Sequence, residues 1–259
     1  MSAPVPLPLV YDRPVLLLGG GPAAPELIAE LRPLCGAVVA ADGGADRLAG
    51  GEPPDAIIGD MDSVGDAEGW RARLGPRFLH EPEQESTDLG KCLRLTRAPL
   101  YLAAGFLGGR LDHSLATLHA LVTHPDRRIL LAGREDLAFL APLRWRATLA
   151  PGARVSIFPM GPCTGLASRG LTWPLENLAL GPETRIGTSN RAEGPVTLET
   201  AAPGILAILP RRLMRPASPW RSRSSWRARA IRTARSRPPA RSRWKRSVTA
   251  SPSPSPRFR

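Results

Sequence analysis

Aspartates recur after short apolar runs in this sequence. Asp42 follows one such run, Asp60 and Asp62 follow another, and Asp88 and Asp112 lie further along. Two carboxylates spaced i, i+2 repel each other unless a cation lies between them. A group of aspartates without His or Cys partners favours a hard cation bound through oxygen, and Mg²⁺ is the usual one. Since Mg²⁺ with few protein ligands binds phosphate oxygens as well, the pattern predicts a phosphate-bearing substrate.

Glycine-rich segments accompany these carboxylates. They lie at 19–21, at 43–44 and at 108–109, and the last is followed by Arg110. Glycines allow backbone amides to approach phosphate oxygens, and arginine binds phosphate through two hydrogen bonds. The first segment also fits G-x-G-x-x-A, a dinucleotide-binding pattern, but that interpretation leaves four downstream aspartates unexplained. The sequence G-x-x-x-x-G-K-[ST] does not occur, which argues against a P-loop kinase.

Two of the aspartates also have a structural interpretation. Asp112 could be the N-cap of a helix that begins at His113, and Asp88 could be a charge in the first turn of another helix. His113 itself is interpreted as a residue of the helix start and not as a catalyst. For Asp60 and Asp62 the spacing favours a functional role.

The apolar pattern predicts the elements that must position these residues. Strands are expected at 15–18, 37–41, 56–58, 99–104 and 129–132, and helices at 89–95, at 114–122 and from Pro25 onward. This alternation predicts an α/β fold with a mostly parallel sheet. Ligands of such sheets bind at the carboxyl ends of the strands, where the loops with the aspartates meet.

The pattern changes near Arg144, where short segments with β alternation begin, broken by Gly and Pro. They lie at 154–158, 165–171, 185–189, 195–200 and 205–209. This pattern predicts a small all-β domain. We therefore expect an α/β domain over residues 1–143 and a β domain over residues 144–210.

The remaining segment, 211–259, differs in composition. It contains 16 Lys and Arg residues and no Asp or Glu, whereas residues 1–210 carry a formal charge of −4. Without apolar periodicity it is expected to be a disordered basic tail, and a change of reading frame near residue 211 is one alternative origin. Its arginines, together with Trp220, Trp226 and Trp244, predict non-specific binding of nucleic acid.

The cysteines and the hydropathy of the N-terminal region indicate the cellular compartment in which the protein is expected. The chain has three cysteines at wide spacing and no C-x-x-C, so neither a disulfide framework nor a zinc site is indicated. The N-terminal region is unlike a signal peptide or a membrane span. A cytoplasmic protein without a membrane partner is the resulting expectation.

Six short motifs, taken in order, resemble those of bacterial thiamine diphosphokinases. The resemblance covers roughly residues 14–210. The motifs are ADGGA (41–45), IGDMDS (58–63), STD (86–88), GGRLDH (108–113), SRGLTWPL (168–175) and TSN (188–190).

The resemblance implies an activity and an assembly. A pyrophosphoryl group would pass from ATP to the hydroxyl of thiamine, giving thiamine diphosphate and AMP. The fold would be an α/β nucleotide domain followed by a β-sandwich domain. Homodimers would bind thiamine between the nucleotide domain of one subunit and the β domain of the other.

The same resemblance implies roles for residues of the first domain. Asp60, Asp62 and Asp88 would hold Mg²⁺ and the triphosphate. Asp112 would face the reacting hydroxyl and act as a catalytic residue together with Arg110. The remaining implied contacts to ATP are Asp42, Gly43, Thr87 and Arg110.

On the thiamine side, Trp173 would stack on the ligand, while Ser189 and Asn190 would supply polar contacts. The alternative for Trp173 is an aromatic residue of the sandwich core. The sequence departs from the family pattern at Glu85, where Asp is frequent, and at Thr117, where Asn is frequent.

Two other functions remain open. A diphosphokinase for another heterocyclic alcohol, such as a hydroxymethylpterin, would keep the aspartates but need a different second domain. A nucleic-acid-binding protein would act through residues 211–259.

Overall fold

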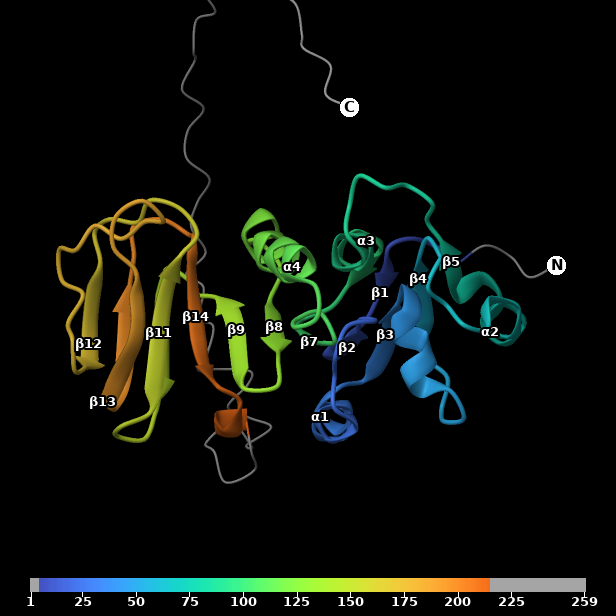
Figure 1. Ribbon diagram of the computed structural model, residues 1–259, viewed down its shortest axis with the longest axis horizontal. Helices are drawn as coiled ribbons and strands as arrows, with labels where there is room; N and C mark the ends of the chain where they lie inside the picture. The colour runs from blue at the N-terminus through green and yellow to red at the C-terminus, as the bar shows by residue number, and fades with distance from the viewer. Residues whose placement is uncertain (1–4, 215–259) are drawn as a thin grey trace, which may run out of the picture.

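Short, wholly buried apolar runs form the centre of the protein. The computed structural model describes residues 5–214 (Figure 1). Six parallel strands lie side by side in the order β8-β7-β2-β3-β4-β5. Burial on both faces explains why the five strands other than β5 are continuously apolar, as is usual for parallel sheets, whereas the edge strand β5 ends in the exposed His80. Their bounds are β2 (Val15–Leu18), β3 (Ala37–Ala41), β4 (Ala56–Gly59), β5 (Phe78–His80), β7 (Tyr101–Ala104) and β8 (Ile129–Ala132).

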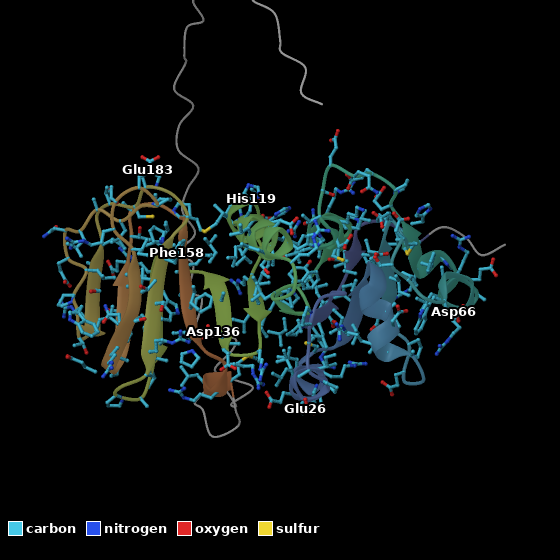
Figure 2. All side chains as sticks on the ribbon, viewed as in Figure 1. Glu26, Asp66, His119, Asp136, Phe158 and Glu183 are labelled. Atoms are coloured by element: carbon cyan, nitrogen blue, oxygen red, sulfur yellow. The ribbon has the colours of Figure 1, made fainter. Side chains whose placement is uncertain are left out.

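Helices cover both faces of this parallel sheet. α1 (Pro25–Leu31) packs with Leu16 and Leu18 of β2, whereas α3 (Asp88–Leu95) and α4 (Leu111–Thr123) pack with the alternate residues Val15 and Leu17. Because successive side chains of a strand point to opposite faces, α1 lies opposite α3 and α4. Figure 2 labels Glu26 on α1 and His119 on α4, on the two sides of the sheet.

Smaller elements complete the first half of the chain. α2 (Ala67–Leu74) buries Trp70 against the outer strands. The 3-10 helices are η1 (Arg32–Leu34), η2 (Asp42–Leu48) and η3 (Gly75–Arg77), and β1 (Leu9–Val10) pairs in parallel with β6 (Thr96–Arg97). η2 follows β3 directly and therefore begins at the carboxyl edge of the sheet.

The second half is antiparallel and continues the same sheet. β9 (Asp136–Leu140) pairs with both β8 and β14 (Ile205–Pro210), so one 12-stranded sheet joins the two halves. β13 (Gly187–Glu199) pairs with β11 (Arg154–Pro159) near its start, and with β10 (Arg144–Thr148) and β12 (Ala167–Leu171) further on. Because β13 pairs with three strands, the β-rich half closes around a hydrophobic core that is separate from the core of the first half. This second core includes Trp145, Val155 and Leu198.

The expected α/β class with a following β-rich domain is confirmed, although some elements differ. The segments expected at 185–189 and 195–200 form the single strand β13. α2 and β9 were not predicted; α2 buries only Trp70 and so carries little periodic signal. The first four residues of the predicted tail form the 3-10 helix η4 (Arg211–Met214). Residues 215–259, with the predicted nucleic-acid contacts, lie outside the described residues.

Within residues 5–214 no helix has both the length and the apolar character needed to cross a membrane.

Candidate active site

A cavity of about 1110 Å³ lies at the carboxyl edge of the parallel strands. The loops that follow β2, β3, β4 and β7 line it, together with the N-terminal ends of α3 and α4. Seven of the residues predicted for ATP and metal binding line this cavity. They are Asp42, Gly43, Asp60, Asp62, Thr87, Asp88 and Arg110.

Asp60 and Asp62 lie on a sharp turn after β4, on either side of Met61. Met61 has a φ of 68°, which is uncommon for a residue other than glycine. The backbone N–H of Asp62 donates to Oδ1 of Asp60 at 3.3 Å, and Nε2 of Gln84 donates to Oδ2 of Asp60 at 2.9 Å. Strained backbone of this kind is retained where the surrounding structure enforces it, and such positions cluster at functional sites.

Asp42 is the most buried of the cavity aspartates, with 4% of its surface exposed. It begins η2 with a φ of 46°. Its Oδ2 accepts the backbone N–H of Ser63 at 3.2 Å, whereas its Oδ1 is buried and has no hydrogen-bond partner among the described residues. A buried carboxylate oxygen without a donor is costly, so this atom is suited to a bound cation or donor.

Asp88 is the first residue of α3. The hydroxyl of Thr87 caps the helix by accepting the N–H of Gly90 at 3.1 Å. Partial burial raises the pKa of Asp88 above its ordinary value, and the negative charge of Asp42 raises it further. The cavity therefore holds carboxylates that repel one another in their charged form.

Lys91 places a positive charge among these carboxylates. Its Nζ lies 3.2 Å from Oδ2 of Asp60 and 3.9 Å from Oδ1 of Asp88. The lysine side chain is 2% exposed. The two aspartates compensate the charge of the buried lysine, and this offsets the cost of removing the ammonium group from water.

The cavity residues suit a divalent cation in their donor chemistry. No three His, Cys, Asp or Glu side chains of residues 5–214 are placed to hold a metal ion together. Mg²⁺, however, binds through one or two carboxylates, with waters and substrate phosphates completing its shell. The unpartnered oxygen of Asp42 and the raised pKa of Asp88 fit this kind of site, in which further positive charge relieves repulsion.

Arg110 and Asp112 form an ion pair at the rim of the cavity. Nη2 of Arg110 lies 2.6 Å from Oδ2 of Asp112, and both side chains are largely exposed. The hydrogen bond from Arg110 lowers the pKa of Asp112 to about 2. Asp112 is not the N-cap of α4, because that position is Arg110, and among the described residues the cavity lining includes His113 but not Asp112.

The residues predicted to contact thiamine lie in the β-rich half, apart from this cavity. The lining, as described, ends at Thr117 and includes none of Trp173, Ser189 and Asn190. Trp173 is 55% exposed and is therefore not a core residue. Its backbone N–H donates to Oδ1 of Asn190 at 3.1 Å, and its carbonyl accepts from Nδ2 of Asn190 at 2.7 Å.

The sequence interpretation missed several residues of the cavity. Lys91 had one signal, its position three residues after Asp88, which places both on one side of a helix. Asp46 and Arg47, which also line the cavity, follow a Gly-Gly pair in a segment without periodicity, so nothing in the sequence marked them.

Comparison with known proteins places these features in a family. A family model described as "Thiamin pyrophosphokinase, catalytic domain" matches residues 30–131, and another described as "Thiamin pyrophosphokinase, vitamin B1 binding domain" matches residues 144–205. Thiamine pyrophosphokinase 1 of Oryza sativa subsp. japonica is 32% identical over 188 residues, which cover 60% of this chain and 71% of the relative. Thiamine pyrophosphokinase 1 of Arabidopsis thaliana is 32% identical over 194 residues, covering 62% and 73%.

Solved structures agree on the fold. A thiamin pyrophosphokinase from Candida albicans superposes with a TM-score of 0.67 at 18% identity, covering 81% of this chain and 95% of that one. One from Geobacillus thermodenitrificans gives 0.63 at 24% identity, covering 76% and 96%. Because the curated relatives are plant proteins, the expectation of a specifically bacterial type is not supported.

Proposed function

The chain belongs to the thiamin pyrophosphokinase family, and from this we propose that it transfers a pyrophosphoryl group from ATP to the hydroxyl of thiamine. The observation that carries the proposal is the cavity at the carboxyl edge of the sheet. Asp42, Asp60, Asp62 and Asp88 meet there beside glycine-rich loops. This combination suits a triphosphate accompanied by a cation.

The reaction requires one new bond and breaks one existing bond. The thiamine hydroxyl oxygen attacks the β-phosphorus of ATP, and the bond from that phosphorus to the oxygen bridging it to the α-phosphorus breaks. AMP leaves with the bridging oxygen, and the hydroxyl proton passes to a base or to water. Positioning and neutralisation of charge dominate such transfers, so the protein supplies no covalent intermediate.

Asp60, Asp62 and Asp88 are the residues proposed to hold Mg²⁺. When bound, the ion supplies neutralisation of the developing phosphate charge. Thr87 and Gly43 line the same space and are proposed as contacts to ATP. Lys91 limits the repulsion among the aspartates before the substrate arrives.

Asp112 is proposed to orient the thiamine hydroxyl. Because Arg110 lowers the pKa of Asp112 to about 2, this carboxylate is a weak base near neutral pH. It is better suited to accept a hydrogen bond from the hydroxyl than to remove the proton early. Arg110 binds Asp112 through Nε and Nη2, and its exposed guanidinium is proposed to contact phosphate with its remaining donors while keeping Asp112 ionised.

Thiamine is proposed to bind between two copies of the chain. Trp173 is exposed and lies outside the cavity lining, which fits a site completed by this residue of a second copy. Leu111 and Leu115 of α4, which follow Arg110, are 74% and 55% exposed. Exposed leucines beside an active site are consistent with a homodimer interface.

Within this arrangement Trp173 would stack on thiamine. Ser189, with a φ of 60°, would supply a polar contact. Asn190 uses its side-chain amide on the backbone of Trp173, so we propose that it also positions the tryptophan.

A cytoplasmic location is a further prediction. Cys35, Cys92 and Cys163 are all free and buried, which suits a reducing compartment.

The test is a coupled assay of AMP release from ATP and Mg²⁺, with and without thiamine. Thiamine-dependent AMP formation is expected, and product analysis should give thiamine diphosphate. A hydroxymethylpterin serves as the second acceptor. AMP release with the pterin but not with thiamine would replace the proposed acceptor, and no acceptor-dependent release would overturn the proposal.

A further inference from the structure

Arg47 directs its guanidinium group at the loop that follows β2. Nε donates to the carbonyl of Gly19 at 3.2 Å, Nη1 to that of Ala23 at 3.2 Å, and Nη2 to that of Gly20 at 3.1 Å. Nη2 also donates to the carbonyl of Gly21. Four of the five N–H groups of an arginine are thereby used on one short stretch of backbone.

The other side of this glycine loop, residues 19–21, is bound to the end of β7. The N–H of Gly19 donates to the carbonyl of Ala104 and the N–H of Gly21 to that of Gly105, both at 2.8 Å. The contact is close: a Cβ on Gly105 would lie 2.3 Å from the carbonyl oxygen of Gly19. The glycine loop is therefore held between Arg47 on one side and the end of β7 on the other, and Gly105 at this end also lines the cavity.

The 3-10 helix that carries Arg47 also binds the loop after β4. Both carboxylate oxygens of Asp46 accept the N–H of Gly65 at 3.1 Å, and Oδ2 of Asp42 accepts the N–H of Ser63 at 3.2 Å. η2 thus connects the glycine loop on one side to the aspartate-bearing loop on the other. Both loops line the cavity, so their separation depends on this short helix.

We propose that Arg47 is a positioning residue for the nucleotide, which fixes the glycine loop so that its backbone can receive the phosphates of ATP. The inference rests on the proposed function and assigns a residue to its nucleotide side. Since a planar peptide unit points its N–H opposite to its C=O, the carbonyl of Gly19, turned toward Arg47, directs the N–H of Gly20 away from it. Within residues 19–21 this is the N–H left for a phosphate, because the N–H groups of Gly19 and Gly21 donate to the end of β7. Arg47 acts through the loop, because four of its five N–H donors are already used on the loop backbone.

The test compares Arg47→Met with Arg47→Lys, and uses Arg32→Met as the matched control. Arg32 is an arginine that forms a surface ion pair with Glu52 at 3.5 Å and does not line the main cavity. Binding of ATP with Mg²⁺ is measured by calorimetry without thiamine, KM is measured for both substrates, and folding is checked by thermal melting.

We expect Arg47→Met to weaken ATP binding at least about tenfold and to leave the KM for thiamine within about twofold, since small losses of positioning have large effects. Arg47→Lys, which keeps the charge and three donors without the planar fork, should fall between the two. ATP affinity within about threefold of the Arg32→Met control would overturn the proposal. So would an equal rise of both KM values.

Three further outcomes bear on this proposal. If Arg47→Met does not fold, Arg47→Lys decides: weaker ATP binding at unchanged KM for thiamine supports the role, and wild-type behaviour overturns it. If the wild type binds ATP but releases no AMP with thiamine, the proposed acceptor fails while the comparison on ATP binding still stands. A wild type that binds no ATP removes both proposals.

Discussion

Nζ of Lys91 lies 3.2 Å from Oδ2 of Asp60, and the lysine side chain is almost completely buried. The pair joins α3 to the turn after β4. It places a fixed cation among the aspartates that are proposed to hold Mg²⁺. On that proposal, stability before binding and charge neutralisation after binding depend on the same side chains.

The first prediction concerns this lysine. Lys91→Met keeps most of the length of the side chain and removes its charge. Removing one partner of a buried pair costs about 3–5 kcal/mol, and we expect about 3 kcal/mol here because Asp60 keeps its hydrogen bond from Gln84. Urea unfolding without metal measures this loss. A loss below about 1 kcal/mol would mean that the aspartates tolerate one another without Lys91.

The second prediction concerns Asp60 and Asp62. Changing either to Asn removes a charge and keeps the shape, so we expect kcat to fall at least ~100-fold, as stabilisation of transition-state charge is lost. Thermal melting should show an intact fold. Asp126→Asn, at an exposed aspartate outside the cavity lining, is the control. Near-normal turnover in both cavity variants would remove these residues from the proposed metal site.

The third prediction concerns pH and Asp88. Its folded-state pKa is raised, so its protonated form is favoured on folding: the resulting stability is present at low pH and is lost as pH rises through the folded pKa. A negative charge at the start of a helix is favourable, but partial burial and Asp42 outweigh this effect. Asp88→Asn should therefore raise Tm at neutral pH without metal.

The same variant has a pH control. Below the ordinary pKa of 3.8 the wild-type carboxyl is protonated in both states, so the two melting curves should converge there. Addition of Mg²⁺ and ATP should stabilise the wild type more than Asp88→Asn. A variant less stable than the wild type at neutral pH would show that the ion pair of Asp88 with Lys91 dominates.

Much of the scaffold could be predicted because its signals are local. The strands are short runs of buried residues that end at Gly or Asp, as at Gly59 and Asp60. The i, i+2 spacing of Asp60 and Asp62 also marks a site without reference to the rest of the chain. Burial of Lys91 depends instead on how α3 packs against β3 and β4, which no window of sequence contains.

The role of Arg47 and the bonds of Asn190 to Trp173 could not be predicted, for a similar reason. The role of Arg47 depends on backbone carbonyls more than 20 residues away, and backbone atoms have no residue type that a pattern could register. Asn190 was predicted to face the ligand, and its bonds to the backbone of Trp173 arise from the pairing of distant segments. Sequence spacing therefore identifies reactive side chains more easily than it identifies the residues that hold those side chains in position.

The fourth prediction concerns Trp173. Because the side chain is 55% exposed, Trp173→Ala should change the free energy of unfolding by no more than about 0.5 kcal/mol. If it stacks on thiamine, binding should weaken by ~1–3 kcal/mol while ATP binding stays intact. Trp145, 2% exposed in the β core, is the matched control: Trp145→Ala should cost about 3–5 kcal/mol of stability. Unchanged thiamine affinity in Trp173→Ala would exclude the stacking role.

The last prediction concerns η4 and the segment after it. Arg211 donates its backbone N–H to the carbonyl of Glu135 at 2.8 Å and its Nη1 to Oε2 of Glu30 at 2.7 Å, while Leu213 and Met214 pack against the core. A chain ending at Pro210 loses these contacts and should be less stable by about 1–3 kcal/mol, as charged hydrogen bonds are lost.

A chain ending at Met214 keeps these contacts and is the matched comparison. It should melt, associate and turn over thiamine like the full chain, because the described fold and cavity lie within residues 5–214. It should also lose salt-dependent binding to nucleic acid, since residues 211–259 carry 16 Lys and Arg residues and 215–259 hold most of them. If the chain ending at Met214 no longer associates, the basic segment contributes to function. The same holds if its kcat/KM falls by more than about tenfold, which corresponds to about 1.4 kcal/mol in the activation barrier.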